Sequence, residues 1–177
     1  MKTANRMKLA AMVMTAGLIG ATAVWAKPPV TQTLEDRVRH ELRMLPRYTI
    51  FDDLSFRVDG NVVTLFGQVT QPYKKSDAEN AVKHVEGVAR VDDQIEVLPL
   101  SPMDDGIRLR EYRAIFSGPL YRYAMGAIPP IHIIVKNGNV KLVGVVANKM
   151  DSQIAYMRAN GVPGVFSVDN QLQIENK

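Results

Sequence analysis

Two stretches of the chain alternate apolar and polar residues in the same way. Residues 54–69 and residues 131–146 place an apolar side chain at every second position, and each stretch is interrupted once by a turn pair, Gly60-Asn61 or Asn137-Gly138. A period of two is typical of half-buried β-strands, and glycine beside asparagine accepts the positive φ of a tight hairpin turn. The pattern therefore predicts two β-hairpins.

Helical spacing is found on either side of the first hairpin. Apolar residues three and four positions apart predict a helix over 34–45 with Thr33 as its N-cap, and a second helix that begins at Pro72 and ends at Gly87. Residues 91–97 alternate again, which completes the order helix, strand, strand, helix, strand. The connection through the second helix is a crossover, so we expect a mixed sheet with both helices on one face.

The second stretch repeats the first at a constant offset of 77 positions. Matching pairs include Val58 and Val135, Leu65 and Leu142, Gly67 and Gly144, Gly87 and Gly164, and Asp92 and Asp169. A repeat that occurs twice at this spacing indicates two copies of one small domain. The predicted fold class is therefore α+β, with tandem αββαβ units over 31–98 and 107–176 joined by a linker over 99–106.

The shared glycines are expected to be structural. We expect Gly67 and Gly144 at a bulge or at the close approach of a helix, and Gly87 and Gly164 where the second helix of each unit gives way to the last strand.

The N-terminus has the pattern of a secretory signal peptide. Basic residues precede an apolar run over 9–24, and small residues ending at Ala26 precede Lys27-Pro28-Pro29. The run is short for a membrane span, so we expect cleavage near Ala26 and export to the bacterial periplasm. An uncleaved N-terminal anchor is the alternative.

Net charge changes the picture once residues 1–26 are set aside. The whole chain carries +4, but residues 27–177 carry only +1, which gives no indication of nucleic-acid binding. Residues 31–100 carry −3 and residues 107–177 carry +5. This contrast indicates either docking of the two units or an anionic partner for the second. The sequence has no cysteine, which excludes disulfides and thiolate metal sites.

The second repeat carries a longer motif. Its hairpin places Asn137-Gly138 before the alternation from Val140 to Val146, and after the second helix the run from Gly164 to Leu172 leads into and forms part of its last strand. This motif resembles the BON domain family (bacterial OsmY and nodulation), and the first repeat departs from it at the inverted turn and at Asp93. The resemblance covers both repeats. It implies an αββαβ unit, tandem occurrence, export to the bacterial envelope, and association with phospholipid surfaces or stress protection rather than catalysis.

The two repeats differ most over residues 107–126, at the position of the second repeat's first helix. The segment combines arginine with aromatic residues: Arg108, Tyr112, Arg113, Phe116, Tyr121, Arg122 and Tyr123. Gly118-Pro119 predicts a break into two short helices. Arginine binds lipid phosphate and tyrosine favours the headgroup level, so these residues are candidates for binding anionic phospholipid or an envelope protein. The alternative is that the rings fill the core and the arginines are hydrated.

The outward face of the second hairpin is more apolar than that of the first. Ile134, Val143 and Val145 fall on this face. Contiguous exposed apolar residues need a cover, which we expect to be the other domain or a second molecule in a homo-oligomer. A ligand or a lipid surface is the alternative.

The chain offers little for catalysis. Its three histidines, His40, His84 and His132, lack the spacing of a metal site, and motifs for phosphate binding or a nucleophile are absent. The acidic pairs at 52–53, 92–93 and 104–105 are interpreted as turn and solubility residues, because neighbours in a strand point to opposite faces. We therefore expect no enzyme activity, no metal and no cofactor.

The leading hypothesis is a non-enzymatic periplasmic envelope protein that associates with phospholipid surfaces or envelope partners, at most peripherally on a membrane. The alternative is a soluble osmotic- or envelope-stress protein with chaperone-like (holdase) behaviour, which would use its bare sheet faces to hold unfolded chains.

Overall fold

The first repeat follows the predicted order of elements. The computed structural model describes residues 32–126 and 128–175, and the predicted signal peptide lies outside them. The elements are α1 (Leu34–Arg43), β1 (Asp53–Asp59), β2 (Val62–Val69), α2 (Pro72–Lys83) and β3 (Arg90–Val97). Thr33 begins α1 with a capping box, in which its hydroxyl accepts from the Asp36 amide while the Asp36 carboxylate accepts from the Thr33 amide.

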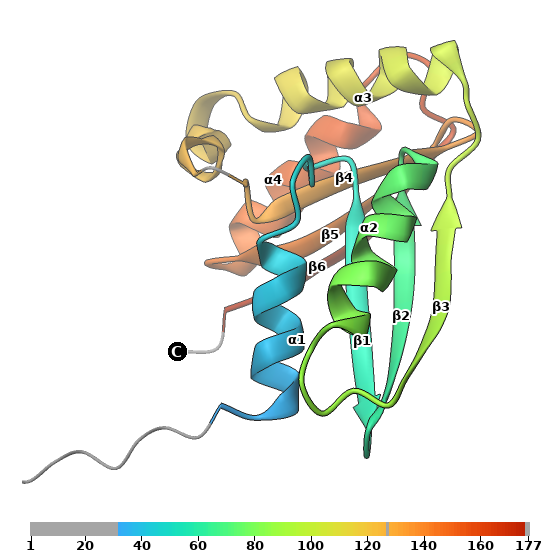
Figure 1. Cartoon of the computed structure of the whole chain (residues 1–177). Helices are drawn as coiled ribbons and strands as arrows, with labels where there is room; N and C mark the ends of the chain where they lie inside the picture. The colour runs from blue at the N-terminus through green and yellow to red at the C-terminus, as the bar shows by residue number, and fades with distance from the viewer. Residues whose placement is uncertain (1–31, 127, 176–177) are drawn as a thin grey trace, which may run out of the picture. The chain divides into compact units, whose positions relative to one another are not determined.

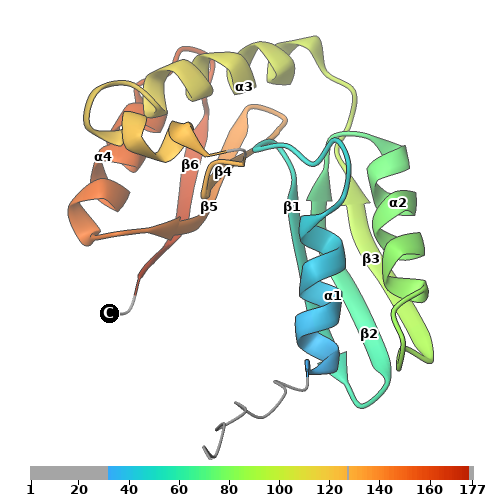
Figure 2. The same cartoon turned by 60° about the vertical axis from the view of Figure 1, so that its left-hand side comes forward.

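The second repeat has the same order with its first helix divided. Its elements are α3 (Pro102–Ile115), the 3₁₀-helix η1 (Gly118–Met125), β4 (Ile131–Lys136), β5 (Asn139–Val146), α4 (Lys149–Asn160) and β6 (Ser167–Ile174). In the views of Figures 1 and 2, α1 and α2 cover one face of the first sheet, and α3 and α4 cover one face of the second.

Both sheets have the same topology. The strand orders are β1-β2-β3 and β4-β5-β6, with an antiparallel first pair and a parallel second pair in each. The registers are equivalent, because Leu54 lies opposite Gly67 just as Ile131 lies opposite Gly144. The predicted α+β class with two mixed three-stranded sheets is confirmed.

Each repeat has its own apolar core between sheet and helices. The first is built around Val38, Val63, Leu65, Val82 and Ile95, and the second around Ile107, Ile115, Ile133, Leu142 and Ala155. Ile50, from the loop before β1, belongs to the second core. The loop at residues 49–52, which precedes β1 of the first repeat, therefore also contributes to the core of the second repeat.

Gly67 and Gly144 are required by a neighbouring strand and not by a helix. A Cβ on Gly67 would lie 2.1 Å from the carbonyl oxygen of Asp53, and one on Gly144 would lie 1.9 Å from that of Pro130. Both glycines have φ near +120°. The expectation of a close helix is therefore corrected: the backbone at the start of the first strand fills the space of the missing side chain.

The second helix of each repeat ends earlier than its glycine. Helix α2 ends at Lys83, and the amides of Val85 and Val88 then bond three residues back in successive tight turns. Gly87, at φ +95°, closes this turn, as Gly164 does at φ +90° after α4. The prediction that the helix ends at Gly87 is therefore corrected: the helix ends at Lys83, and Gly87 lies in the turns that follow it.

Candidate functional site

Helix α3 begins inside the segment predicted as a linker. The Ser101 hydroxyl accepts from the Asp104 amide, and Pro102 occupies the first helical position, where its missing N–H costs nothing. Residues 102–106 are therefore helical, contrary to the expected linker over 99–106. The predicted break at Gly118-Pro119 is confirmed, since Gly118 has φ +52° and η1 begins there.

Some of the predicted binding residues point inward. Arg108 is 5% exposed, and its guanidinium donates to the carbonyl of Val135 (2.7 Å). Phe116 belongs to the core. Arg108 on α3 and Phe116 just after its last residue are both buried, so they are not on the outer surface, contrary to our expectation. Tyr123 is half-buried, and its hydroxyl donates to the Asp151 carboxylate (2.6 Å).

The other predicted residues are exposed on the outer side of the second repeat's helices. Tyr112 and Arg113 lie on α3, and Tyr121 and Arg122 lie on η1. Further exposed residues on α3, η1 and α4 extend this set: Leu109, Arg110, Met125, Lys149, Met150 and Met157. We call these exposed residues together the cationic helical layer.

Acidic side chains are nearly absent from the outside of this layer. Asp104, Glu111 and Asp151 are all buried. The remaining acid of these helices, Asp105, is exposed and pairs with Arg108 at 2.5 Å. Because Arg110, Arg113, Arg122 and Lys149 are exposed while three of the four acids of these helices are buried, the layer presents a positive surface with apolar side chains among its charges.

Arg122 is an exposed cation that is held in place by its neighbours. It forms an ion pair with Asp151, next to the Tyr123 hydroxyl. Hydrogen bonds with Tyr123 and Asp151 raise the pKa of Arg122 further above its ordinary value. Arg122 therefore also holds η1 against the first turn of α4.

The outward face of the second sheet meets groups of the first repeat. Ile134 is 2% exposed and lines a small cavity with Gln68. Lys136 pairs with Glu96 at 2.5 Å, and Lys141 lies 3.6 Å from Asp53. Hydrogen bonds from Lys136 and Gln68 lower the pKa of Glu96.

The two valines expected on this face lie in a groove. Val143 is half-buried and Val145 is exposed, and both line a groove of about 610 Å³ together with Phe66. Contacts with the first repeat thus cover Ile134 and leave Val145 partly open.

Two acidic residues interpreted as solubility groups are buried instead. Asp52 is fully buried and forms an ion pair with Lys74 at 2.5 Å. Its carboxylate also accepts from the amides and hydroxyls of Thr49 and Thr70. Burial alone would raise its pKa, but the hydrogen bonds from Lys74, Thr49 and Thr70 together outweigh burial and lower the pKa.

Asp104 is also fully buried, and it holds the second hairpin turn. Its carboxylate accepts from the amides of Asn137 and Gly138, both at 2.8 Å. The interpretation as a linker residue is therefore corrected: Asp104 ties the first turn of α3 to the hairpin, and the neighbouring Asp105 is the exposed member of the pair.

Glu111 is the least satisfied buried acid among the described residues. It is fully buried on α3, and neither carboxyl oxygen has a hydrogen-bond partner. Burial raises its pKa to about 8. The folded protein therefore keeps this side chain protonated at neutral pH, because a charged carboxylate would be unpaired in the core.

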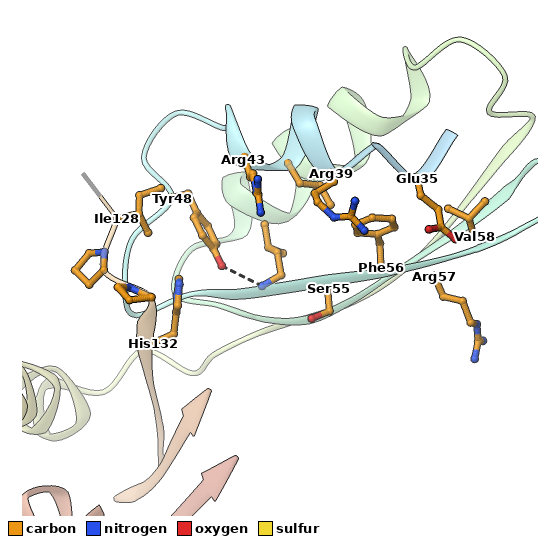
Figure 3. Close-up of a pocket in the computed structure, with 14 residues that line it drawn as sticks. Glu35, Arg39, Arg43, Tyr48, Ser55, Phe56, Arg57, Val58, Ile128 and His132 are labelled. Atoms are coloured by element: carbon orange, nitrogen blue, oxygen red, sulfur yellow. Dashed lines mark hydrogen bonds between the residues drawn. The ribbon is translucent and has the colours of Figure 1, made fainter. Parts of the chain in front are cut away.

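A second surface feature lies along β1. A groove of about 910 Å³ is lined by five consecutive β1 residues, 54–58, by the outer side of α1, and by residues 128–130 (Figure 3). Tyr48 and His132 close one end, with ring centroids 5.4 Å apart. We call this the β1 edge groove.

The closed end of the β1 edge groove is held by buried polar groups. The Tyr48 hydroxyl accepts from the Leu54 amide (3.3 Å), and His132 Nδ1 donates to the Asp52 carbonyl (2.6 Å). Burial raises the pKa of Tyr48 and lowers that of His132, so both are neutral at pH 7. Their hydrogen bonds go to backbone, which indicates a structural role.

No helix within the described part of the chain combines the length and apolar character needed to cross a membrane. Residues 32–126 and 128–175 also contain no cluster of acidic and histidine side chains suited to hold a metal ion.

The two repeats, which share their αββαβ topology and the positions of their glycines and hairpin turns, match one known family. A model described as the BON domain matches residues 31–99 and 126–176. The chain belongs to the BON domain family. The family is associated with phospholipid binding and with proteins of envelope and osmotic stress, and it is generally non-enzymatic. The matched segments are the two repeats, which confirms the tandem BON assignment.

Solved structures similar to this BON protein include two of CdsD, a structural protein of the type III secretion system of Chlamydia trachomatis. One is of the CdsD C-terminal domain, with 12% identity, a TM-score of 0.28, and coverage of 79% of this chain and 96% of that one. The other has 14% identity, a TM-score of 0.28, and coverage of 81% and 93%. No curated protein matches the chain.

Proposed function

We propose that this BON protein is a non-enzymatic protein of the bacterial envelope that binds anionic phospholipid surfaces reversibly, through the cationic helical layer of its second repeat. The association of the family with phospholipid binding supports the general class of ligand. The proposal adds the surface, the sign of its charge and the residues involved.

The observation that carries the proposal is the segregation of charge on α3, η1 and α4. Arg110, Arg113, Arg122 and Lys149 face outward, while the acids of the same helices are buried, apart from the paired Asp105. A basic residue near an anionic membrane contributes about 1 kcal/mol, so four such residues are enough for reversible attachment.

Exposed apolar side chains among these cations favour a lipid surface over a dissolved anion. Tyr112 and Tyr121 are 40% and 61% exposed, and Met125, Met150 and Met157 are more exposed still. Tyrosine rings favour the headgroup level and apolar side chains insert below it, while arginine binds phosphate above.

The first repeat lacks this combination. On α1 the exposed acids Glu35, Asp36 and Glu41 stand among the exposed Arg39 and Arg43. This mixed surface gives little net attraction to an anionic membrane, so we assign lipid binding to the second repeat.

Flotation with vesicles tests the proposal. Replacing Arg110 and Arg113 by glutamate should weaken binding to vesicles of phosphatidylglycerol and phosphatidylcholine by at least about tenfold. These two side chains are preferable to Arg122, whose reversal would also leave the buried Asp151 without its partner. Binding of the unaltered protein should also decrease as salt rises.

The matched control reverses two exposed cations of the first repeat. Lys83→Glu with Arg90→Glu changes the net charge equally, on residues outside the layer. We expect this variant to bind nearly as well as the unaltered protein. Equal weakening by both variants, or equal binding to purely neutral vesicles, would contradict the assignment.

The proposal also locates the protein in the periplasm, because residues 1–26 have the pattern of a signal peptide. Fractionation of cells followed by mass spectrometry should find a chain that begins at Lys27 in the periplasmic fraction, with a membrane-attached share that high salt releases. A chain that retains residues 1–26 would refute the location.

A further inference from the structure

The outer edge of β1 is a strand edge whose backbone groups point away from the sheet. In the order β1-β2-β3, β1 pairs only with β2. The Leu54 amide donates to the Tyr48 hydroxyl on the side away from β2. Because backbone groups alternate along a strand, the N–H and C=O of Phe56 and Val58 point to the same outer side. Asp59 and Val62 face each other across the two-residue turn, where a hairpin has a hydrogen-bonded pair. This fits the same alternation, because it directs the backbone groups of Asp59 and Arg57 toward β2 and those of Val58 and Phe56 away from it.

The equivalent edge of the second repeat is occupied. At the offset of 77, Phe56 corresponds to Ile133 and Val58 to Val135. The Ile133 amide donates to the carbonyl of Ile50 (2.7 Å), and the Val135 carbonyl accepts from Arg108 (2.7 Å). In the second repeat this edge is therefore satisfied by a backbone carbonyl from the turn at residues 49–52 and, at its far end, by a guanidinium.

In the first repeat no such partner is present within residues 32–126 and 128–175. The β1 edge groove runs along the open edge instead, between β1 and the outer side of α1. Its apolar lining includes Leu42, Phe56 and Val58, and the Phe56 ring is half-buried. An apolar floor beside backbone donors and acceptors that have no partner within the described residues is the arrangement that binds a peptide by strand addition.

The charge around the groove defines the side chains of such a peptide. Arg39, Arg43 and Arg57 line it, and Glu35 is its one acid among the described residues. Figure 3 shows Arg39 over the Phe56 ring, with 5.7 Å between its guanidinium carbon and the ring centroid, and Arg57 extending on the other side of β1. Positive side chains on both sides of an edge favour carboxylates on the incoming strand.

We propose that the β1 edge groove binds an extended acidic segment of a partner protein, which adds to the first sheet beside β1 as a fourth strand. Backbone hydrogen bonds to Phe56 and Val58 hold the segment. Its carboxylates pair with Arg43 and Arg57 and compete with Asp36 for Arg39, which pairs with Asp36 at 3.0 Å. Binding at this edge is independent of the lipid surface proposed for the second repeat.

Titration with a synthetic peptide tests this proposal. The probe is acetyl-Glu-Val-Glu-Val-Glu-Val-amide, and the control is the same peptide with lysine in place of glutamate. Calorimetry on the purified protein measures affinity, and amide hydrogen exchange by NMR measures protection residue by residue. We expect the acidic peptide alone to bind, and to slow exchange at Phe56 and Val58 while Ile133 is unchanged.

Protein variants separate backbone pairing from charge. Val58→Pro removes one outward N–H at an edge position where proline is tolerated, and Val58→Ala is its control because it keeps that N–H. We expect at least about fivefold weaker binding for the proline variant and little change for alanine. Arg39→Glu with Arg43→Glu lies on the exposed side of α1, leaves the strand intact, and should weaken binding at least about tenfold.

Several results would overturn the proposal. Binding of both peptides alike, or binding without protection of Phe56 and Val58, would mean that no acidic strand is added. Protection that rises with protein concentration in the free protein would assign the edge to a second copy of the chain. Protection that is present at every concentration would assign it to another segment of the same chain.

The charge-reversal variants of the protein distinguish this proposal from the proposed lipid binding. Arg110→Glu with Arg113→Glu should leave peptide binding unchanged, and Arg39→Glu with Arg43→Glu should leave binding to anionic vesicles nearly unchanged. Failure of one proposal would therefore not resemble failure of the other.

Discussion

The two BON repeats share a backbone but use opposite charges at matching places. Lys74 and Asp151 are 77 positions apart, both in the first turn of the second helix and both buried. Lys74 pairs with Asp52 from the loop before β1, whereas Asp151 pairs with Arg122 from η1. Both repeats thus have an ion pair at the first turn of the second helix. The helix supplies the cation in the first repeat and the anion in the second, and the partner comes from a different element in each.

The same contrast extends to the surfaces. On the helices of the second repeat most acids are buried and most cations face outward, and the sheet edge is occupied. In the first repeat the α1 surface carries both signs and the β1 edge borders an open groove. The two repeats therefore share a scaffold, while their exposed groups differ.

The largest expected effect is at the buried ion pair of the first repeat. Asp52→Ala leaves the Lys74 ammonium buried without its carboxylate, so we expect the free energy of unfolding to fall by about 3–5 kcal/mol. Asp151→Ala in the second repeat should cost only about 1–2 kcal/mol, since Arg122 is half-exposed and can be hydrated. Urea unfolding followed by circular dichroism compares the two, and equal losses would contradict the contrast.

The response to pH should also distinguish the repeats. Glu111 in the second repeat has a folded-state pKa of about 8 against an ordinary value of 4.5, because burial disfavours its charged form. Its contribution to stability is therefore present at low pH and lost as pH rises through 8. Between pH 5 and pH 8.5 we expect a loss of about 3–4 kcal/mol, which Glu111→Gln should largely abolish.

Asp52 should act in the opposite direction. Its pKa is lowered in the folded state, so its contribution is present above its ordinary pKa of 3.8 and lost as pH falls further. Urea unfolding at pH 3, 5, 7 and 8.5 should show acid loss that depends on Asp52 and alkaline loss that depends on Glu111. An alkaline loss that persists in Glu111→Gln would refute the assignment.

The matching glycines should respond alike, because they belong to the shared scaffold. Gly67→Ala and Gly144→Ala place a Cβ against a backbone carbonyl in both repeats, and we expect each to cost about 2–3 kcal/mol. Gly60→Ala has φ +58° and open space around its Cβ, so it should cost only about 1 kcal/mol. Thermal unfolding measures all three. A large difference between Gly67 and Gly144 would mean that the scaffold is not equivalent.

The smallest effect is expected at the exposed ion pair between the repeats. Lys136 and Glu96 are both more than two-fifths exposed, so Glu96→Gln should change the free energy of unfolding by about 0.2–1 kcal/mol. High salt should remove this difference. An effect above 2 kcal/mol would mean that the contact contributes more than a hydrated pair can.

The hairpins, the crossovers and the duplication could be predicted from sequence because they depend on local signals. Gly60-Asn61 and Asn137-Gly138 determine the turns, and the alternation on either side determines which side chains are buried. The break at Gly118-Pro119 is local as well.

The candidate site was only partly predictable, because burial of a polar residue depends on partners far along the chain. Arg108 is buried because its acceptor is the Val135 carbonyl, and Asp52 is buried because Lys74 lies beside it. One signal was present in the sequence. Alignment of the repeats places Lys74 at the position of Asp151. A change in the sign of the charge at a shared position indicates an ion pair whose other member has changed sign as well.

Hydrogen exchange on vesicle-bound protein is the most direct test of the central claim that the second repeat holds the chain to anionic phospholipid. Compared with free protein, the account predicts slower exchange over 102–125 and 149–160, with no change over 34–43 and 72–83. Protection centred on the first repeat, or none in either repeat while the protein floats with the vesicles, would contradict the account.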